Sequence, residues 1–124
     1  MPTDRLFVGI GAILAFVGVA GGAFGAHALR DRLGVEMLAI FETGVRYQMY
    51  HALALVGVGL FATRTTAPQL PVAGWLFVAG TIIFSGSLYL LAITGARWWG
   101  AVTPLGGVCF LAGWAVFAWA AFRG

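Results

Sequence analysis

Charged residues are scarce in this sequence. They make up 9% of its 124 residues, lysine is absent, and the seven basic residues are all arginines. A typical soluble domain carries about 25% charged residues. Because a short chain has a large surface for its volume, a soluble fold would need many more polar side chains. The scarcity of charge therefore excludes a water-soluble globular domain and favours lipid as the surrounding solvent.

Cysteine is nearly absent as well. Cys109 is the single cysteine, and it lies in an apolar stretch. One thiol cannot form a disulfide within the chain, and there is no CxxC pair for a metal or redox site. We interpret Cys109 as a small packed apolar residue, which is the usual role of a buried free cysteine.

The sequence also lacks a cluster of basic residues. The net charge is +3, but the arginines are scattered, with only Arg30 and Arg32 close together. Proteins that bind nucleic acids gather their basic residues on one face or along one helix. We therefore predict no nucleic-acid partner, and we interpret the arginines as residues that flank membrane spans.

Long apolar runs dominate what is present. Hydrophobic residues make up 61% of the chain. At a rise of ~1.5 Å per residue, about 20 residues cross a hydrocarbon core of ~30 Å. The runs predict four transmembrane helices, at about residues 6–28, 44–63, 71–95 and 103–122. The predicted fold is all-α, an integral membrane four-helix bundle that forms a single domain over residues 1–124.

The first run also has a feature of a signal peptide. Ala26-His27-Ala28 fits the small-x-small pattern of a cleavage site. However, the uncharged run from Leu6 to Leu29 is longer than an ordinary signal-peptide core, and few basic residues precede it. We therefore expect this run to be retained as a membrane span.

A polar stretch, residues 30–46, separates the first two runs and has a helical period. Its apolar residues recur every four positions: Leu33, Met37, Phe41 and Val45. This pattern predicts an amphipathic segment between the first two helices, which either lies in the membrane interface or leads into the second span. We expect the second helix to begin near Glu42. Two pairs at a spacing of four residues could interact, Arg32 with Glu36 and Glu42 with Arg46.

Prolines and aromatic residues indicate where the other helices begin and end. Pro71 suits the first turn of the third span, and Thr103 followed by Pro104 is typical of an N-cap and the first helical residue. Aromatic rings are expected to form belts at both membrane interfaces. One predicted belt contains Tyr47, Tyr50, Trp98 and Trp99, and the other contains Trp75 and Trp119.

The arginines fall on both sides of the predicted membrane. Four spans place three arginines on the side of the chain ends and four on the opposite side: Arg5, Arg64 and Arg123 against Arg30, Arg32, Arg46 and Arg97. Orientation follows the excess of basic residues in short cytoplasmic loops. A difference of one arginine does not determine which side is cytoplasmic.

Small residues recur every seven positions in three of the predicted spans. These positions are Gly11, Gly18 and Gly25, then Gly80, Ser87 and Thr94, and finally Gly106, Gly113 and Ala120. Such stripes let two helix backbones approach closely in lipid. They could form a dimerisation face or pack the helices of one bundle together. We favour packing within the bundle, because several spans carry a stripe.

Polar residues concentrate where the first span ends and the second begins. The residues of this candidate polar cluster are His27, Arg30, Glu42, Arg46, Tyr47, Gln48, Tyr50 and His51. Ionisable groups at membrane depth are costly, so they usually face the bundle interior or a wet cavity. We expect these residues to meet on one side of the membrane.

The polar cluster could serve several roles. The interpretation we favour is a structural network that fixes the connection between the first two helices, since buried polar groups are generally hydrogen-bonded. A proton relay or a pocket for a small solute is the main alternative. Two histidines without a recognisable ligand spacing are weak grounds for a metal site. No catalytic motif is present, so we predict no catalytic residue, no metal, no cofactor and no enzymatic activity.

Four segments resemble the DUF423 family, also called the UPF0382 or YgdD-like membrane proteins. The segments run in order along nearly the whole chain: Gly22-Ala23-Phe24-Gly25-Ala26-His27, residues 43–54, Phe84-Ser85-Gly86-Ser87-Leu88-Tyr89, and Thr103-Pro104-Leu105-Gly106-Gly107 with Gly113-Trp114. The resemblance implies a small multi-span protein of the bacterial inner membrane. It implies no activity and no catalytic residue. It adds four polar positions to the candidate site: Ser85, Ser87, Tyr89 and Thr103.

Two functions follow as expectations. The first is a structural or accessory membrane component, in contact with the lipid bilayer and assembled as a homo-oligomer or within a larger membrane complex. The second is a carrier or channel for a small solute or a proton, which would use the polar cluster at the first two helices.

Overall fold

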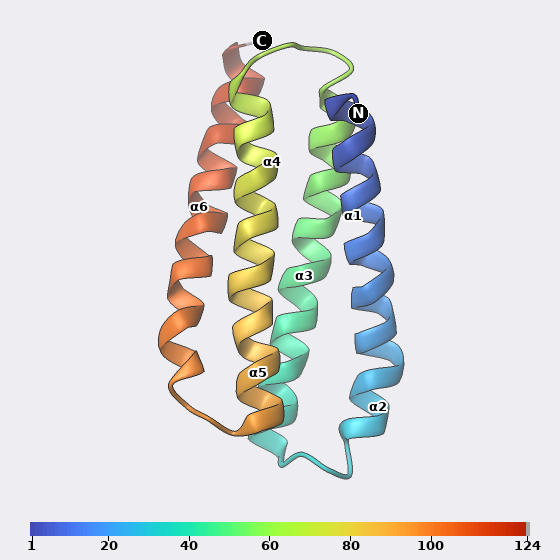
Figure 1. The fold of residues 1–124 in the computed structure, drawn as a ribbon, viewed down its shortest axis with the longest axis vertical. Coiled ribbons are helices and arrows are strands. Elements are labelled where there is room, and N and C mark those ends of the chain that lie inside the picture. Colours follow the sequence, from blue (N-terminus) through green and yellow to red (C-terminus); the bar gives the residue numbers. More distant parts are fainter. Residues whose placement is uncertain (124) are drawn as a thin grey trace.

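The chain folds into four long helices in the computed structural model, which describes residues 1–123 (Figure 1). Two of the long helices are assembled from shorter elements. The first consists of α1 (Thr3–Val19), the π-helical segment η1 (Ala20–Gly25) and α2 (Ala26–Leu29), and the third consists of α4 (Gln69–Gly80), the π-helical segment η2 (Thr81–Ser85) and α5 (Gly86–Thr94). The second and the fourth are single helices, α3 (Val35–Phe61) and α6 (Trp99–Arg123). The predicted all-α fold is confirmed. Gly124, the last residue of the predicted domain, lies outside the described residues.

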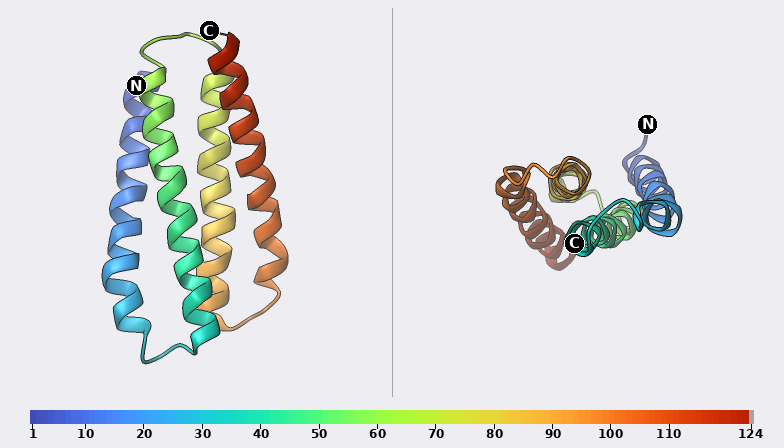
Figure 2. Two further views of the ribbon diagram at one scale, coloured as in Figure 1. Left: turned by 180° about the vertical axis from the view of Figure 1, so that it is seen from behind. Right: turned by 90° about the horizontal axis from the view of Figure 1, so that it is seen from below.

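Successive helices run in opposite directions. Both chain ends and the 62–68 connection lie at one end of the bundle, and the 30–34 and 95–98 connections lie at the other (Figure 1). The first helix packs along α3, and α6 packs along the third helix, while α3 also contacts the third helix. Seen end-on, α1 and α6 therefore lie on the outside of the arrangement (Figure 2).

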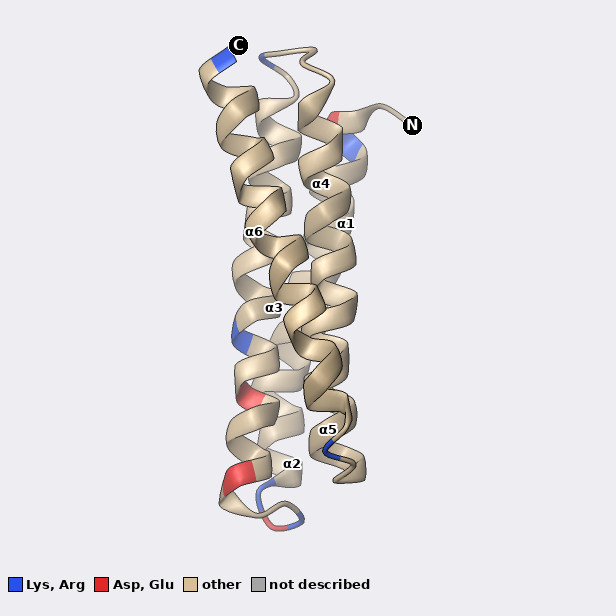
Figure 3. Cartoon of the chain, turned by 90° about the vertical axis from the view of Figure 1, so that its left-hand side faces the viewer, with Lys and Arg blue, Asp and Glu red and all other residues tan. Residues whose placement is uncertain are grey.

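Three helices are long and apolar enough to cross a membrane, namely Thr3–Leu29, Gln69–Thr94 and Trp99–Arg123. The remaining helix, α3, has 27 residues and lies beside them. Its first half carries most of the polar residues, which lowers its hydropathy. Most charged residues gather towards the two ends of the bundle, but α3 also carries charged positions nearer to the middle (Figure 3), where its sequence has Glu42 and Arg46.

Most of the stripe residues face a neighbouring helix, although Thr94 is exposed. A Cβ added at Gly11 would lie 2.6 Å from the Ala52 carbonyl oxygen of α3, and one at Gly18 would lie 2.5 Å from the Met49 sulfur. A Cβ at Gly113 of α6 would similarly lie 2.8 Å from the ring of Phe77. The stripes therefore let α1 approach α3 and let α6 approach the third helix, which confirms the expectation of packing within the bundle.

Most of the polar stretch after the first helix forms the first turns of α3. Residues 30–34 form a short connection, and α3 begins at Val35, earlier than the predicted start near Glu42. The apolar residues of the stretch explain the early start, because Phe41 is buried and stacks near Tyr89 of α5. Packing against the third helix thus extends α3 beyond its purely apolar part.

The predicted start of the fourth helix is wrong. Thr103 and Pro104 were expected as N-cap and first residue, but α6 begins at Trp99 and contains Pro104. The Thr103 hydroxyl lies 2.6 Å from the Ser87 hydroxyl and does not cap a backbone N–H. A proline is tolerated in a membrane helix where neighbouring groups satisfy the freed backbone. Thr103 Oγ1 is 3.3 Å from the Trp99 carbonyl oxygen, whereas the carbonyl that Pro104 leaves without its helical partner is that of Gly100.

The predicted aromatic belt at the 95–98 end is also wrong in part. Arg97 contacts Glu36, which places Trp98 and Trp99 level with the start of α3. Tyr47 lies eleven residues further along α3, so the two sets of rings are separated by roughly 16 Å along the helix axis. Tyr47 packs on Phe84, well inside the bundle length, and cannot share a belt with the tryptophan pair.

Candidate functional site

Gln48 joins three helices through its side-chain amide. It is buried, and its Nε2 donates to the Leu14 carbonyl of α1 at 2.8 Å. Its Oε1 accepts a hydrogen bond from the Tyr89 hydroxyl of α5 at 2.6 Å. Both ends of the amide are thus partnered by groups from other helices. An arrangement of this kind fixes how helices sit against one another, because a buried polar group is costly without a partner.

His51 lies one turn further along α3 and faces α6. It is 4% exposed, and its Nδ1 lies 2.7 Å from the Tyr47 carbonyl oxygen. The Trp114 indole N–H donates to its Nε2 at 3.1 Å. A carbonyl only accepts and an indole only donates, so Nδ1 carries the hydrogen and Nε2 does not. These two bonds define a neutral ring with one tautomer.

The His51 ring is also held by packing. It stacks on Phe110 of α6 with ring centroids 3.5 Å apart and an angle of 8° between the planes. The ring of Phe77 in α4 also contacts it, with ring centroids 5.5 Å apart and an angle of 54° between the planes. His51 therefore links α3 to α6 and α4. A ring confined in this way can connect helices, but both of its nitrogens are already occupied by the protein.

The hydroxyl positions added by the family resemblance connect the third helix to its neighbours. Ser85, in η2, donates to the Gly44 carbonyl of α3 at 2.6 Å. The Ser87 hydroxyl lies 2.6 Å from that of Thr103 in α6. The π-helical segment widens the backbone locally at Ser85, and such segments are frequent where a helix is adapted to a specific contact.

Two buried polar atoms have no partner among residues 1–123. They are Thr81 Oγ1 in η2 and Gln69 Oε1 at the start of α4. Every other buried polar residue in the spans forms a hydrogen bond, namely Gln48, His51, Ser85 and Ser87. Most buried polar side chains therefore have hydrogen-bond partners within the protein.

Three more residues of the cluster, His27, Arg30 and Glu42, lie near the end of the first helix. An Arg30 guanidinium nitrogen lies 2.7 Å from His27 Nδ1, and both side chains are exposed. Glu42 of α3 shares a cavity of about 220 Å³ with them. This cavity contains polar and small residues and lies beside η1. It is separate from the hydrogen bonds of Gln48 and His51.

Neither predicted ion pair of the polar stretch is present in the described chain. Arg46 donates to the Thr43 hydroxyl at 3.1 Å and not to Glu42. Glu36 forms a salt bridge of 3.0 Å with Arg97, 61 residues away, and not with Arg32. The hydrogen bond and charge of Arg97 hold the pKa of Glu36 below its ordinary value. The fold brings the 95–98 connection beside the start of α3, which local spacing could not reveal.

The structure thus distributes the predicted cluster over several places. Gln48 faces α1 and α5, His51 faces α6, and the His27, Arg30 and Glu42 group lies at the end of the bundle. Tyr47 and Tyr50 are exposed and pack edge-to-face against each other with centroids 5.5 Å apart.

Sequence reasoning missed Trp114 as a polar partner. The residue lies in an apolar run, and its single N–H carries no charge. The sequence separation of 63 residues from His51 left no local pattern to find it. The only available indication was its place in the fourth family-like segment.

An apolar groove adjoins His51 between α3 and α6. Its volume is about 450 Å³. The lining residues are Tyr47, His51, Phe84, Pro104, Gly107, Val108, Phe110, Leu111 and Trp114. Apart from the Tyr47 hydroxyl, the polar side-chain groups that line the groove already form hydrogen bonds within the protein. In the part of the chain that the structure describes, no three His, Cys, Asp or Glu residues come together as a metal site would require.

Comparison with known proteins gives consistent results. The family model described as "Protein of unknown function (DUF423)" matches residues 21–107. The chain is 45% identical over 119 residues to a UPF0382 membrane protein of Staphylococcus epidermidis, covering 96% of this chain and 97% of the relative. It is 43% identical over 120 residues to the UPF0382 membrane protein YwdK of Bacillus subtilis, covering 96% and 98%.

A more distant organism carries a similar chain. The UPF0382 inner membrane protein YgdD of Escherichia coli K12 is 41% identical over 121 residues, covering 98% of this chain and 92% of the relative. No solved structure matches the chain. The printed names of these relatives state a membrane location and no activity.

Proposed function

The chain belongs to the DUF423 family of membrane proteins, and from that premise we propose that it is a non-catalytic structural or accessory component of the bacterial inner membrane. It acts by holding apolar helix faces in a fixed arrangement for other membrane-embedded helices. The observation that carries this proposal is the division between a bonded interior and an uncovered exterior. Polar side chains are used to join the helices, and among residues 1–123 no other helix lies against the outer faces of α1 and α6.

The outer face of α1 has an uneven surface of the kind that packs against another helix. Small and large residues alternate every four positions along it and continue into η1: Ala12, Phe16, Ala20 and Phe24. The two phenylalanines are 77% and 74% exposed, and a shallow groove of about 390 Å³ lies between them. Lipid tails are as apolar as these side chains, so there is no hydrophobic driving force for helices to associate in a membrane. Association depends instead on close packing of complementary surfaces of this kind. This face therefore suits a partner helix, either in a second copy or in a larger complex.

Isolation in mild detergent tests the proposal. We expect native mass spectrometry of the membrane-extracted protein to show a defined assembly, either a homo-oligomer or a complex with another membrane protein. A lone monomer under conditions that preserve known membrane complexes would contradict the proposal.

Cysteine crosslinking localises the contact. In a Cys109→Ser background, Phe16→Cys on the outer face of α1 should crosslink in native membranes. Leu53→Cys is the matched control, since Leu53 is exposed on α3, a different helix. Equal crosslinking from both positions would show random collision and would argue against a defined interface on α1.

A carrier or channel is the second candidate, and the groove beside His51 is the observation that favours it. Proton relay through His51 would require its bond to Trp114 to open. Flux into liposomes containing the wild type, His51→Ala or Arg46→Ala tests this function. Flux that is present in the wild type and lost in a variant would support a transport function. An absence of flux in the wild type would contradict it.

A further inference from the structure

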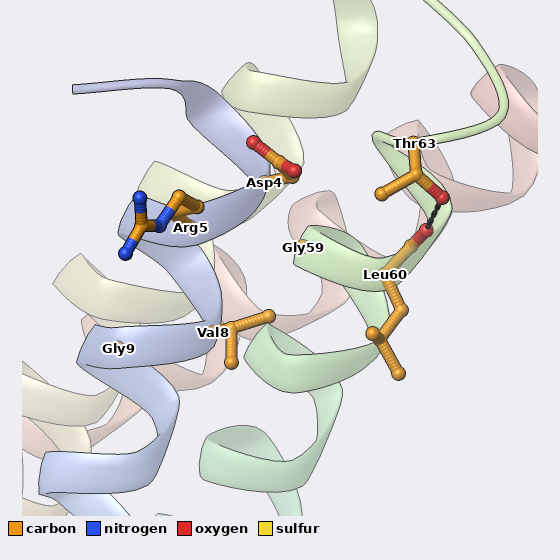
Figure 4. A pocket seen from close by; sticks show the side chains of 7 residues that line it. All are labelled: Asp4, Arg5, Val8, Gly9, Gly59, Leu60 and Thr63. Carbon is orange, nitrogen blue, oxygen red and sulfur yellow. Dashed lines mark hydrogen bonds between the residues drawn. The ribbon is translucent and has the colours of Figure 1, made fainter.

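A groove with charged residues at its mouth lies between the first turns of α1 and the end of α3. Figure 4 shows it from close by, with Asp4, Arg5, Val8 and Gly9 on α1 and with Gly59, Leu60 and Thr63 at the end of α3. Its volume is about 270 Å³. The groove lies at the end of the bundle that carries both chain ends (Figure 1).

Two glycines shape this groove in different ways. Gly59 allows the helices to touch, since a Cβ there would lie 2.6 Å from the Asp4 carbonyl oxygen and 2.8 Å from the Val8 nitrogen. Gly9 leaves the groove open, because nothing lies within 4 Å of the position of its Cβ. The helix contact thus forms the back of the groove, and the missing side chain of Gly9 forms its opening.

The mouth of the groove carries two opposite charges. Asp4 and Arg5 are adjacent, and in Figure 4 the carboxylate points up between the helices while the guanidinium points to the opposite side of α1. Neither forms a salt bridge in residues 1–123. The Thr63 hydroxyl donates to the Leu60 carbonyl at 2.7 Å, so its oxygen can still accept a hydrogen bond.

Polarity changes along the groove in the direction of the membrane. The charged residues belong to the first helical turn, and the following wall is made by Val8, Gly9 and Leu60. Leu60 is 60% exposed, which places an apolar surface directly below the charges. A ligand that matches this sequence of surfaces has a charged head and an apolar chain.

We propose that this groove binds one zwitterionic phospholipid, whose headgroup carries a phosphate and an ammonium. The exposed Arg5 side chain turns towards the groove to bind the phosphate, Asp4 binds the ammonium, and an acyl chain lies over Gly9 and against Leu60. Charge-assisted hydrogen bonds between guanidinium and phosphate are among the stronger polar contacts in proteins. An anionic lipid without an amine would satisfy Arg5 and leave Asp4 facing a negative headgroup. A soluble zwitterion would leave the apolar wall uncovered.

The first experiment blocks the groove without changing the fold. Delipidated protein in mild detergent is titrated with phosphatidylethanolamine, and native mass spectrometry measures the Kd of the first bound lipid. We expect Gly9→Leu to weaken this binding about tenfold or more, because the new side chain occupies the opening. Gly86→Leu is the matched control, since nothing lies within 4 Å of Gly86 either and it lies in the third helix.

A thermal unfolding curve accompanies each variant. Leucine is a better helix former than glycine, so neither substitution should lower the Tm. If Gly9→Leu keeps its Tm and binds the lipid as tightly as the wild type, the proposed site is overturned. Equal loss of binding in Gly9→Leu and Gly86→Leu would also overturn it.

The second experiment identifies the headgroup chemistry. Phosphatidylethanolamine, phosphatidylglycerol and free phosphoethanolamine are compared on the wild type, Arg5→Gln and Asp4→Asn. We expect Arg5→Gln to weaken both lipids, and Asp4→Asn to weaken phosphatidylethanolamine alone, each by about tenfold for one lost charge-assisted contact. A wild type that prefers phosphatidylglycerol, or that binds the soluble zwitterion as tightly as the lipid, would overturn the proposal.

Discussion

At the scale of single residues, polar side chains act as connections between helices. Gln48 and His51 lie one turn apart on α3 but point to different helices, α1 and α6. Each makes two hydrogen bonds that use opposite ends of its polar group. A helix that presents polar groups on several faces needs a partner on each face, which explains why α3 is the central helix.

The Trp114 bond offers a direct test of this role. Trp114→Phe removes the N–H that reaches His51 Nε2 and leaves that nitrogen buried without a donor. We expect the free energy of unfolding to fall by about 1 kcal/mol, since hydrogen bonds within membranes contribute little more than those in water. Titration of the detergent-solubilised protein with SDS measures the change.

The control for this substitution is Trp119→Phe. Trp119 is also in α6, but it is exposed. Its replacement removes the same atoms without leaving a buried group unsatisfied, so it should change stability less. If both variants lose the same stability, the His51–Trp114 bond is not what stabilises the α3–α6 contact.

Residue-level pairing was the least predictable part of the sequence. The four-residue spacings predicted Arg32 with Glu36 and Glu42 with Arg46, whereas Glu36 pairs with Arg97. Local spacing describes which side chains share a helix face, but the choice of partner depends on which connection the fold brings nearby. The residue types that would be buried and bonded were predictable, because ionisable and amide groups in a span need partners.

At the scale of elements, glycine stripes determine how closely two helices approach. Gly11→Ala should destabilise the protein by about 1–3 kcal/mol, since its Cβ would lie 2.6 Å from the Ala52 carbonyl oxygen and would force α1 away from α3. Gly57→Ala, where nothing lies within 4 Å, should instead stabilise α3 slightly through its helix propensity. SDS titration compares the two variants. Equal effects would show that the stripe does not limit the helix contact.

The salt bridge between α3 and the 95–98 connection predicts a pH dependence. Arg97 holds the pKa of Glu36 below its ordinary value of 4.5. The stabilisation is therefore present above a pH of about 4.5 and is lost as the pH falls through the lower folded pKa. Thermal unfolding between about pH 3 and pH 6 compares the Tm of the wild type with that of Glu36→Gln. We expect the two Tm values to converge at the acid end of this range. Because both side chains are exposed, we expect the Tm difference to be small. A Tm difference that grows as the pH falls would contradict a stabilising Glu36–Arg97 salt bridge.

Element boundaries show where sequence and structure differ. The apolar runs correctly predicted the positions of all four helices, because apolar segments of this length have few possible structures other than a helix. The helix starts were less accurate, since α3 and α6 both extend into polar or aromatic segments that pack on neighbouring helices. At Thr103 the capping pattern was present, but the hydroxyl was used by Ser87 of the adjacent helix. Tertiary contacts override a local cap when the alternative partner is buried.

At the scale of the whole molecule, the arrangement has a bonded centre and two open sides. The centre consists of α3 and the third helix, and every side-chain hydrogen bond between the long helices involves at least one of these two. The outer helices α1 and α6 each pack against one side of it. A protein built in this way exposes two different apolar surfaces, so the assembly proposed above could use α1 without involving the groove beside His51.

The number of membrane spans is the last consequence of this arrangement. By hydropathy alone three helices qualify as spans, and an odd number would place the chain ends on opposite sides of the membrane. We propose that α3 is the fourth span, because it lies beside the other three and its buried Gln48 and His51 are satisfied by their groups. Both chain ends should therefore lie on the same side.

Reporter fusions measure this directly. A reporter that works only in the cytoplasm is fused to the N-terminus or to the C-terminus, and a second reporter that works only outside it is fused in parallel. We expect both ends to give the same answer, with a reporter inserted in the 30–34 connection giving the opposite one. Opposite answers from the two ends would mean that α3 does not cross the membrane, and that its polar residues face the surface and not the bundle.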